Sequence, residues 1–279
     1  MTEEKNERQQ ILVALDGSRE SLAALDAAVS LAKELDADLI GLFVEDVNLV
    51  RLAQMPFARE VHLTTARFRT LTSEEMSTAM RVQAARIRRA LRNATQEAGI
   101  QGELRIVRGL VPTAVTAAAV NADLLILGRI SRPLNRRIRL GSTARAALAQ
   151  ASRSILLMRQ HQAAQRSVLV TFDNTDLSWR ALRKAVALSD PDYPLTLLLL
   201  TPSPAEAKMW QAQIEVWLQE RDWPANFRHL PQATMSGLLR VVQEEQCDLL
   251  IIGGERLPVS ADTAVSLLNQ LDCSLMLVR

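Results

Sequence analysis

Apolar residues recur along the chain in two alternating patterns. Short continuous apolar runs, such as those at 11–15, 39–44 and 124–127, have the length of buried strands. Between them lie segments in which apolar residues return every three or four positions, the spacing of one face of a helix. Continuous apolar strands that alternate with amphipathic helices are typical of a parallel sheet covered on both faces. The chain is therefore predicted to be an α/β protein.

Capping residues sharpen the predicted boundaries. Ser18 stands where it can cap a helix after the first apolar run, and Thr72 with Glu75 forms a capping box for a long helix. Gly99 is the expected stop of that helix. Three further strands, near residues 103–107, 124–127 and 155–158, complete one unit of five strands.

The chain repeats itself. The segment 11–16, ILVALD, returns as VLVTFD at 168–173, and DLLILG at 123–128 returns as DLLIIG at 248–253. The offset between the copies falls from 157 to 125 residues, so the second copy is shorter. A repeat of this size predicts two tandem flavodoxin-like or Rossmann-like units with five-stranded parallel sheets. We place the domains at 1–160 and 161–279 and expect them to pack as an intramolecular pseudo-dimer; a homodimer of the whole chain is left open.

Composition limits the class of protein. Apolar residues make up 48% of 279 residues, enough for two cores. No apolar run reaches the roughly 20 residues of a membrane helix, and the first ten residues are charged and lack the apolar centre of a secretion signal. We expect a cytoplasmic protein without a membrane partner, with Cys247 and Cys273 as reduced core residues.

The stretch from Gly128 to Thr143 carries the candidate chemistry. A glycine closes an apolar strand, an arginine-rich segment follows, and Gly141-Ser142-Thr143 opens an alanine-rich helix. Hydroxyl groups and backbone amides at a helix N-terminus favour a phosphate. Asp16, at the end of the first strand, is expected at the same edge of the sheet, where such folds bind ligands.

This stretch resembles a motif of the universal stress protein family: glycine, two residues, glycine, nine residues, then Gly-Ser or Gly-Thr. Here Gly128 and Gly141-Ser142 match the motif, and Ser131 replaces the middle glycine. With ILVALDGS, LFVED, Gly109, Pro112 and SILLMR, the resemblance covers most of residues 10 to 159, and a weaker copy covers the rest. It implies an adenine-nucleotide alpha-hydrolase-like fold and a stress-linked sensor or adaptor that binds ATP, ADP or AMP.

The resemblance also implies which residues hold the nucleotide. Asp16 and the backbone at Val44 would hold adenine and ribose, and the segment from Gly128 to Thr143 would hold phosphates. The full expected set is Leu15, Asp16, Val44, Gly128, Arg129, Ser131, Gly141, Ser142 and Thr143. A Mg²⁺ ion bound with the phosphates is left open. A Cβ at position 131 would cost on the order of 1–2 kcal/mol if the family's glycine there has a positive φ.

The second copy is expected not to bind ATP. Its glycine turn is followed by a shortened segment without a Gly-Ser pair, and Glu255 and Asp262 bring negative charge to the place of the phosphates. Charge also separates the halves: residues 1–160 hold 23 Lys and Arg against 17 Asp and Glu, whereas residues 161–279 hold 10 against 14. Opposite net charges favour docking of the halves, or an anionic ligand on the first half alone.

Two other functions stay open. The chain could be an interaction module that has abandoned the nucleotide, as Ser131 suggests, or a weak ATPase or self-phosphorylating protein. No Walker motif and no lysine occur in the 128–143 segment, and no catalytic residues are predicted. With only 4% aromatic residues, a nucleic-acid partner is not expected.

Overall fold

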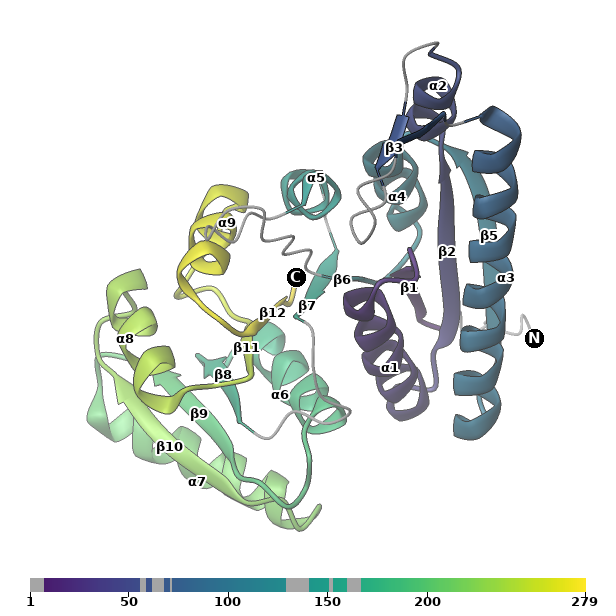
Figure 1. Ribbon diagram of the computed structural model, residues 1–279. Helices are drawn as coiled ribbons and strands as arrows, with labels where there is room; N and C mark the ends of the chain where they lie inside the picture. Colours follow the sequence, from purple (N-terminus) through teal and green to yellow (C-terminus); the bar gives the residue numbers. More distant parts are fainter. Residues whose placement is uncertain are drawn as a thin grey trace, which may run out of the picture.

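A computed structural model describes residues 8–55, 59–61, 68–70, 72–128, 141–150, 153–159 and 167–279 of the chain (Figure 1). We call residues 8–159 the first lobe and residues 167–279 the second lobe. Both alternate strands and helices along the chain, as the apolar pattern predicts.

Among its described residues, the first lobe contains five strands of the large sheet, one small two-stranded hairpin and five helices. In chain order they are β1 (Gln10–Ala14), α1 (Arg19–Glu34), β2 (Asp38–Asp46), α2 (Val47–Ala53), β3 (Arg59–Val61), β4 (Phe68–Thr70), α3 (Ser73–Ala98), β5 (Gly102–Gly109), α4 (Val111–Ala119), β6 (Leu124–Gly128), α5 (Ser142–Gln150) and β7 (Ser154–Met158).

The second lobe repeats this order without the hairpin and without a counterpart of α2. Its elements are β8 (Val168–Phe172), α6 (Asp176–Leu188), β9 (Leu195–Leu200), α7 (Pro204–Gln219), β10 (Ala225–Leu230), α8 (Met235–Glu245), β11 (Leu249–Ile252), α9 (Ala261–Gln270) and β12 (Ser274–Leu277).

The ten strands of the large sheet lie in the order β10-β9-β8-β11-β12-β7-β6-β1-β2-β5. Within each lobe every pairing is parallel, and the five strands follow the order third, second, first, fourth, fifth. The α/β prediction with two five-stranded parallel units is confirmed. Of the two doubly wound orders, this is the Rossmann-like one, in which the chain reverses direction across the sheet between its first and fourth strands.

The predicted helix ends lie where capping chemistry places them. Ser18 accepts the backbone N–H of Ser21 at the start of α1, and Thr72 and Glu75 form the reciprocal capping box of α3. Gly99 ends α3 in the left-handed conformation, at φ 70°. The energy of such caps, about 1 kcal/mol each, explains why these boundaries can be predicted from residue type alone.

Helices cover both faces of the sheet, and both cores run across the two lobes (Figure 1). One face packs against α1, α3, α6 and α7, and the other against α4, α5, α8 and α9. The lobes meet where β7 pairs antiparallel with β12, with Leu156 opposite Met276 and both side chains fully buried. Arg159 adds an ion pair to Asp272 at 2.8 Å across the same joint.

The segment 46–71 has no counterpart in the second lobe. Its described part consists of α2, which packs on α3, and the antiparallel pair β3–β4. Leu49, Leu52 and Met55 on and after α2 are between 42% and 47% exposed. The sequence marks this segment as an insertion, but its apolar residues do not show the regular spacing that would have predicted a helix and a hairpin.

The shared core predicts that the two lobes unfold together. Ile126, in β6 of the first lobe, is fully buried, so Ile126→Ala should lower the free energy of unfolding by about 2–5 kcal/mol. All four tryptophans, Trp179, Trp210, Trp217 and Trp223, lie in the second lobe. Urea unfolding followed by tryptophan fluorescence should therefore shift to lower urea, although the substitution lies in the other lobe.

The control for this experiment is Val120→Ala, at a first-lobe side chain that is 67% exposed, and it should leave the midpoint nearly unchanged. Far-ultraviolet circular dichroism follows both lobes. If Ile126→Ala moves the dichroism transition and leaves the fluorescence transition in place, the lobes are independent folding units.

Candidate functional site

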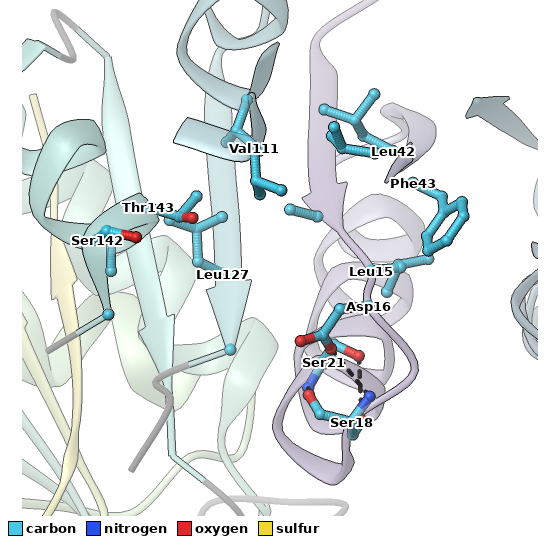
Figure 2. A pocket seen from close by; sticks show the side chains of 16 residues that line it. Leu15, Asp16, Ser18, Ser21, Leu42, Phe43, Val111, Leu127, Ser142 and Thr143 are labelled. Carbon is cyan, nitrogen blue, oxygen red and sulfur yellow. Dashed lines mark hydrogen bonds between the residues drawn. The ribbon is translucent and has the colours of Figure 1, made fainter. Parts of the chain in front are cut away.

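A pocket of about 220 Å³ opens at the carboxyl edge of the first lobe's strands (Figure 2). It lies where β1 ends between β2 and β6, which is the point at which the order of the sheet reverses. The crossovers on the two sides of this point lead away from each other, so a crevice is left between them. The first turns of α1 and α5 supply its polar wall, and β2 and α4 supply its apolar wall.

Asp16 is held at the mouth of the pocket by its own turn. One carboxylate oxygen accepts the backbone N–H of Ser18 at 2.9 Å, and its carbonyl oxygen accepts the side-chain amide of Gln83 at 2.9 Å. Gly17 adopts φ +75°, and a Cβ there would overlap the Gln83 amide. The turn thus needs glycine, and it leaves the Asp16 carboxylate exposed on the pocket side.

Gly128 has a packing role in addition to its place in the motif. A Cβ at this position would lie 2.7–2.9 Å from atoms of Glu20 and Ser21, in the first turn of α1. Only glycine therefore allows the end of β6 to approach that turn. The approach brings the ends of β1 and β6 and the start of α1 around one pocket.

The start of α5 forms the opposite wall, so Ser142 and Thr143 lie across the pocket from Asp16 in Figure 2. The first hydrogen bond of this helix runs from the N–H of Arg145 to the carbonyl of Gly141 at 3.0 Å. The N–H groups before Arg145 are therefore outside the helical ladder. Together with the two hydroxyls, they give this wall the chemistry of an anion site.

Apolar side chains line the remaining wall, and our sequence reasoning missed most of them. Leu42, Val111, Val115 and Leu127 belong to this group, together with Phe43. Val111 begins α4 directly after β5, and Leu42 lies beside Ala14 in the register of β1 and β2. The sequence could have predicted this wall, because residues next to the carboxyl ends of parallel strands lie at one edge of the sheet.

Seven of the nine predicted site residues line this one pocket: Leu15, Asp16, Val44, Gly128, Gly141, Ser142 and Thr143. Arg129 and Ser131 lie outside the described residues, as do the arginines at 132–139. Val44 lies two residues before the end of β2, because this strand continues to Asp46 along β5. That these residues contact a nucleotide stays a prediction.

The corresponding edge of the second lobe is closed by its own aspartate. Asp173 occupies the position of Asp16, but it is only 5% exposed. Its carboxylate accepts the backbone N–H groups of Glu255 at 2.6 Å and Arg256 at 2.9 Å, which follow the glycine turn after β11. It also accepts the hydroxyl of Thr175 at 2.6 Å. The Asp173 carboxylate thus accepts the hydrogen bonds of the backbone N–H groups that a ligand anion would otherwise bind.

The two predicted negative charges follow the glycine turn of this lobe: Glu255 has an exposed side chain, and Asp262 lies in the first turn of α9. That they repel a phosphate stays a prediction. The contact to Asp173 comes from the backbone N–H of Glu255. Gly254, at φ +122°, lets the chain pass close to the Asp173 carboxylate, where a Cβ would lie 2.5 Å from both oxygens. Leu257, only 6% exposed, belongs to the same buried core as Leu200 and Leu238.

The pKa of Asp173 reflects these contacts. Burial raises the pKa, but the hydrogen bonds from the Thr175 hydroxyl and from the N–H groups of Arg256, Glu255 and Thr175 outweigh it. The net pKa lies below the ordinary value of 3.8. The carboxylate is therefore ionised at neutral pH and acts as a fixed anion.

Among the described residues, no group of three or more His, Cys, Asp and Glu side chains is arranged to hold a metal ion. No helix in the described part of the chain is long and apolar enough to cross a membrane.

The fold and the pocket place the first lobe among doubly wound α/β proteins with a candidate ligand site at the switch point. The family model of the universal stress protein family matches residues 7–159. The chain belongs to this family, as the resemblance in the sequence indicated.

Solved structures show the same fold over the whole chain. A universal stress protein from Archaeoglobus fulgidus DSM 4304 is 14% identical, with a TM-score of 0.60 over 97% of this chain and 98% of its own. A putative universal stress protein from Pseudomonas aeruginosa UCBPP-PA14 is 16% identical, with a TM-score of 0.55 over 97% and 93%. Comparison with curated proteins gave no significant match.

The pair Asp173 and Asp16 provides a matched test of the closed second lobe. Asp173→Asn replaces an ionised acceptor with an amide that cannot satisfy the same N–H groups, and should cost about 1–3 kcal/mol of unfolding free energy at pH 7. Asp16→Asn, at the equivalent but exposed strand end, should change it by no more than about 0.5 kcal/mol. Urea midpoints measured by tryptophan fluorescence compare the two variants.

The difference between the wild type and Asp173→Asn should depend on pH. Because the folded-state pKa is lowered, the stabilisation is complete above the ordinary value of 3.8 and is lost as the pH falls through the lower folded-state value. The two midpoints should therefore converge below about pH 4. Equal midpoints at pH 7 would show that the carboxylate contacts contribute nothing.

Proposed function

We propose that the first lobe binds an adenine nucleotide (ATP, ADP or AMP) and that the protein is a stress-response sensor or adaptor. The observation that carries this proposal is the single pocket that gathers Asp16, Gly128 and Ser142 at the switch point. Membership of the universal stress protein family supports the link to stress.

The chemistry of the pocket fits the parts of a nucleotide. Leu42, Val111 and Val115 form an apolar wall for a flat base. The exposed carboxylate of Asp16 can accept hydrogen bonds from ribose hydroxyls. The start of α5, with Ser142 and Thr143, offers donors and the positive end of the helix dipole to a phosphate.

The arginines of segment 129–140 would act on the phosphates in this proposal. Five arginines, at positions 129, 132, 136, 137 and 139, follow β6 directly in the sequence. Guanidinium groups bind phosphate oxygens in a bidentate manner, so one or two of them would suffice to neutralise a polyphosphate tail. A Mg²⁺ ion would enter with the nucleotide, bound by its phosphates.

The second lobe would serve as the structural partner of the first, in an intramolecular pseudo-dimer. At its carboxyl edge Asp173 accepts the N–H groups of Glu255 and Arg256, so these groups are satisfied without a ligand. Nucleotide on the first lobe would change the surface around segment 129–140 that is offered to another protein. Such a change requires that the nucleotide bind one state of the segment more tightly than another.

A second candidate is an interaction module that no longer binds nucleotide. Ser131 favours it, because the family motif has glycine at this position. Both candidates share the fold, so only ligand binding separates them.

Calorimetry with ATP and AMP tests the proposal. Saturable binding is expected for the wild type, and Val111→Phe should weaken it at least about tenfold, because a larger side chain fills the apolar wall. Asp16→Ala should weaken it by a similar factor through loss of a charged acceptor. No heat at millimolar nucleotide would support the interaction module.

Val120→Phe is the matched control for Val111→Phe. It makes the same change at the other end of α4, at a side chain that is 67% exposed, and should leave the affinity unchanged. Release of inorganic phosphate from ATP, measured in the same samples, would show that the protein is also a weak ATPase.

A further inference from the structure

A second cavity, of about 280 Å³, lies at the opposite edge of the first lobe's sheet and is lined by both lobes. On the first-lobe side it is lined by Gln9, which precedes β1, by Asp123, which precedes β6, and by Arg153, which precedes β7. On the second-lobe side α6 contributes Arg180, Arg183 and Lys184. The cavity therefore lies at the amino ends of strands whose carboxyl ends form the pocket.

Positive charge dominates this cavity. Asp123 is the acidic side chain in its lining, and both of its oxygens are engaged: one accepts the N–H of Gln10 at 2.9 Å and the other pairs with Arg153 at 3.2 Å. Among the described residues, no acidic side chain forms an ion pair with Arg180, Arg183 or Lys184. Three cations thus share one cavity without an ion pair to those residues, and the charge of Asp123 acts on Lys184 from a longer distance.

The three cations lie on one face of α6. Positions 183 and 184 lie three and four residues after position 180, which brings their side chains near that of Arg180 on the helix. Two guanidinium groups and one ammonium group provide the fork-shaped and point-charge donors that bind phosphate oxygens. The volume is about nine times the share of one water in the liquid, so an anion with several oxygens has room.

The internal repeat shows that these cations are not required by the fold. The hydrogen bond from the N–H of Gln10 to Asp123 has an equivalent in the second lobe, where Asp248 accepts the N–H of Ser167. By contrast, α1 has Ala23, Asp26 and Ala27 at the positions equivalent to the three cations of α6. A structural feature is repeated in both lobes, and the basic cluster occurs in one.

Lys184 shows the cost of the arrangement. Its pKa is lowered from 10.5 to about 8, because burial, with a smaller contribution from the nearby Arg180 and Arg183, outweighs the opposing effect of Asp123. The other charged residues of the lining are Arg153 and Arg279; the backbone N–H of Arg279 is bound by Ser154 at 3.1 Å. An anion in the cavity would offset the repulsion among these cations.

We propose that this cavity is a second ligand site, which binds a small polyvalent phosphate anion between the two lobes. The ligand would contact Arg180, Arg183 and Lys184 of α6 on one side and the Arg153 side of the first lobe on the other. It would thereby stabilise the docking of the lobes as well as neutralise the cluster. The site is separate from the nucleotide pocket and does not depend on it.

Calorimetry with inorganic pyrophosphate on the full chain tests this site. The wild type should bind saturably in low-salt buffer, and the double variant Arg183→Ala, Lys184→Met should bind at least about tenfold more weakly. The double variant Arg221→Ala, Lys208→Met removes the same charge from two exposed positions, one on α7 and one two residues after its end, and should bind as the wild type does. Ser142→Asp, which places a negative charge at the phosphate part of the nucleotide pocket, should also leave pyrophosphate binding intact, which separates this result from the nucleotide proposal.

Proton uptake gives a second readout. Between the pKa of about 8 and the ordinary value of 10.5, the ammonium group of Lys184 is partly deprotonated, and a bound anion should restore its proton. Titrations in two buffers of different ionisation enthalpy should reveal more proton uptake in the wild type than in Lys184→Met, because the ionisation of pyrophosphate itself contributes to both.

Three results would overturn the inference. The first is no binding of pyrophosphate, and the second is equal binding by the wild type and the Arg183→Ala, Lys184→Met variant, which would place the anion elsewhere. The third is binding of a long duplex DNA but not of pyrophosphate, which would make the cluster part of an extended macromolecular surface. Circular dichroism of each variant checks that the fold is retained.

Discussion

Backbone N–H groups at the carboxyl edge of a parallel sheet must find acceptors, and this requirement governs both lobes. Strands end there, helices begin there, and the first N–H groups of each helix have no partner within the helix. In the second lobe Asp173 accepts the N–H groups of Glu255 and Arg256, and the edge is complete without a ligand. In the first lobe Asp16 accepts the N–H of Ser18 in its own turn, so the start of α5 faces the open pocket.

The internal repeat makes this comparison unusually direct. Gly128 and Gly253 perform the same task, since a Cβ at either position would collide with the N-terminal part of the facing helix. What differs is the chain after the glycine, which is shorter in the second lobe and brings Gly254 against the aspartate. The lobe with the shorter loop thus has a buried structural carboxylate where the other lobe has an accessible one, and the strand order is the same in both.

Most of the fold could be predicted because its signals are local. Apolar runs mark the strands, and Ser18, Thr72, Glu75 and Gly99 mark helix ends through hydrogen bonds to their own neighbours. The antiparallel joint of β7 and β12, the hairpin β3–β4 and the Asp173 contacts were not predicted in these terms, because each depends on residues brought together by the tertiary fold. The same reason explains the missed apolar wall of the pocket, where Val111 and Leu42 are distant in sequence.

The helix α1 connects the two candidate sites and limits how they can influence each other. Its first turn, with Ser18 and Ser21, lines the pocket, and Leu35 at its end lines the basic cavity. Sixteen residues of helix span about 24 Å, more than twice the distance over which charges act through physiological salt. Direct electrostatic coupling between ligands at the two sites is therefore weak. Any mutual effect must pass through displacement of α1 itself or of the second lobe, which packs against α1 through α6.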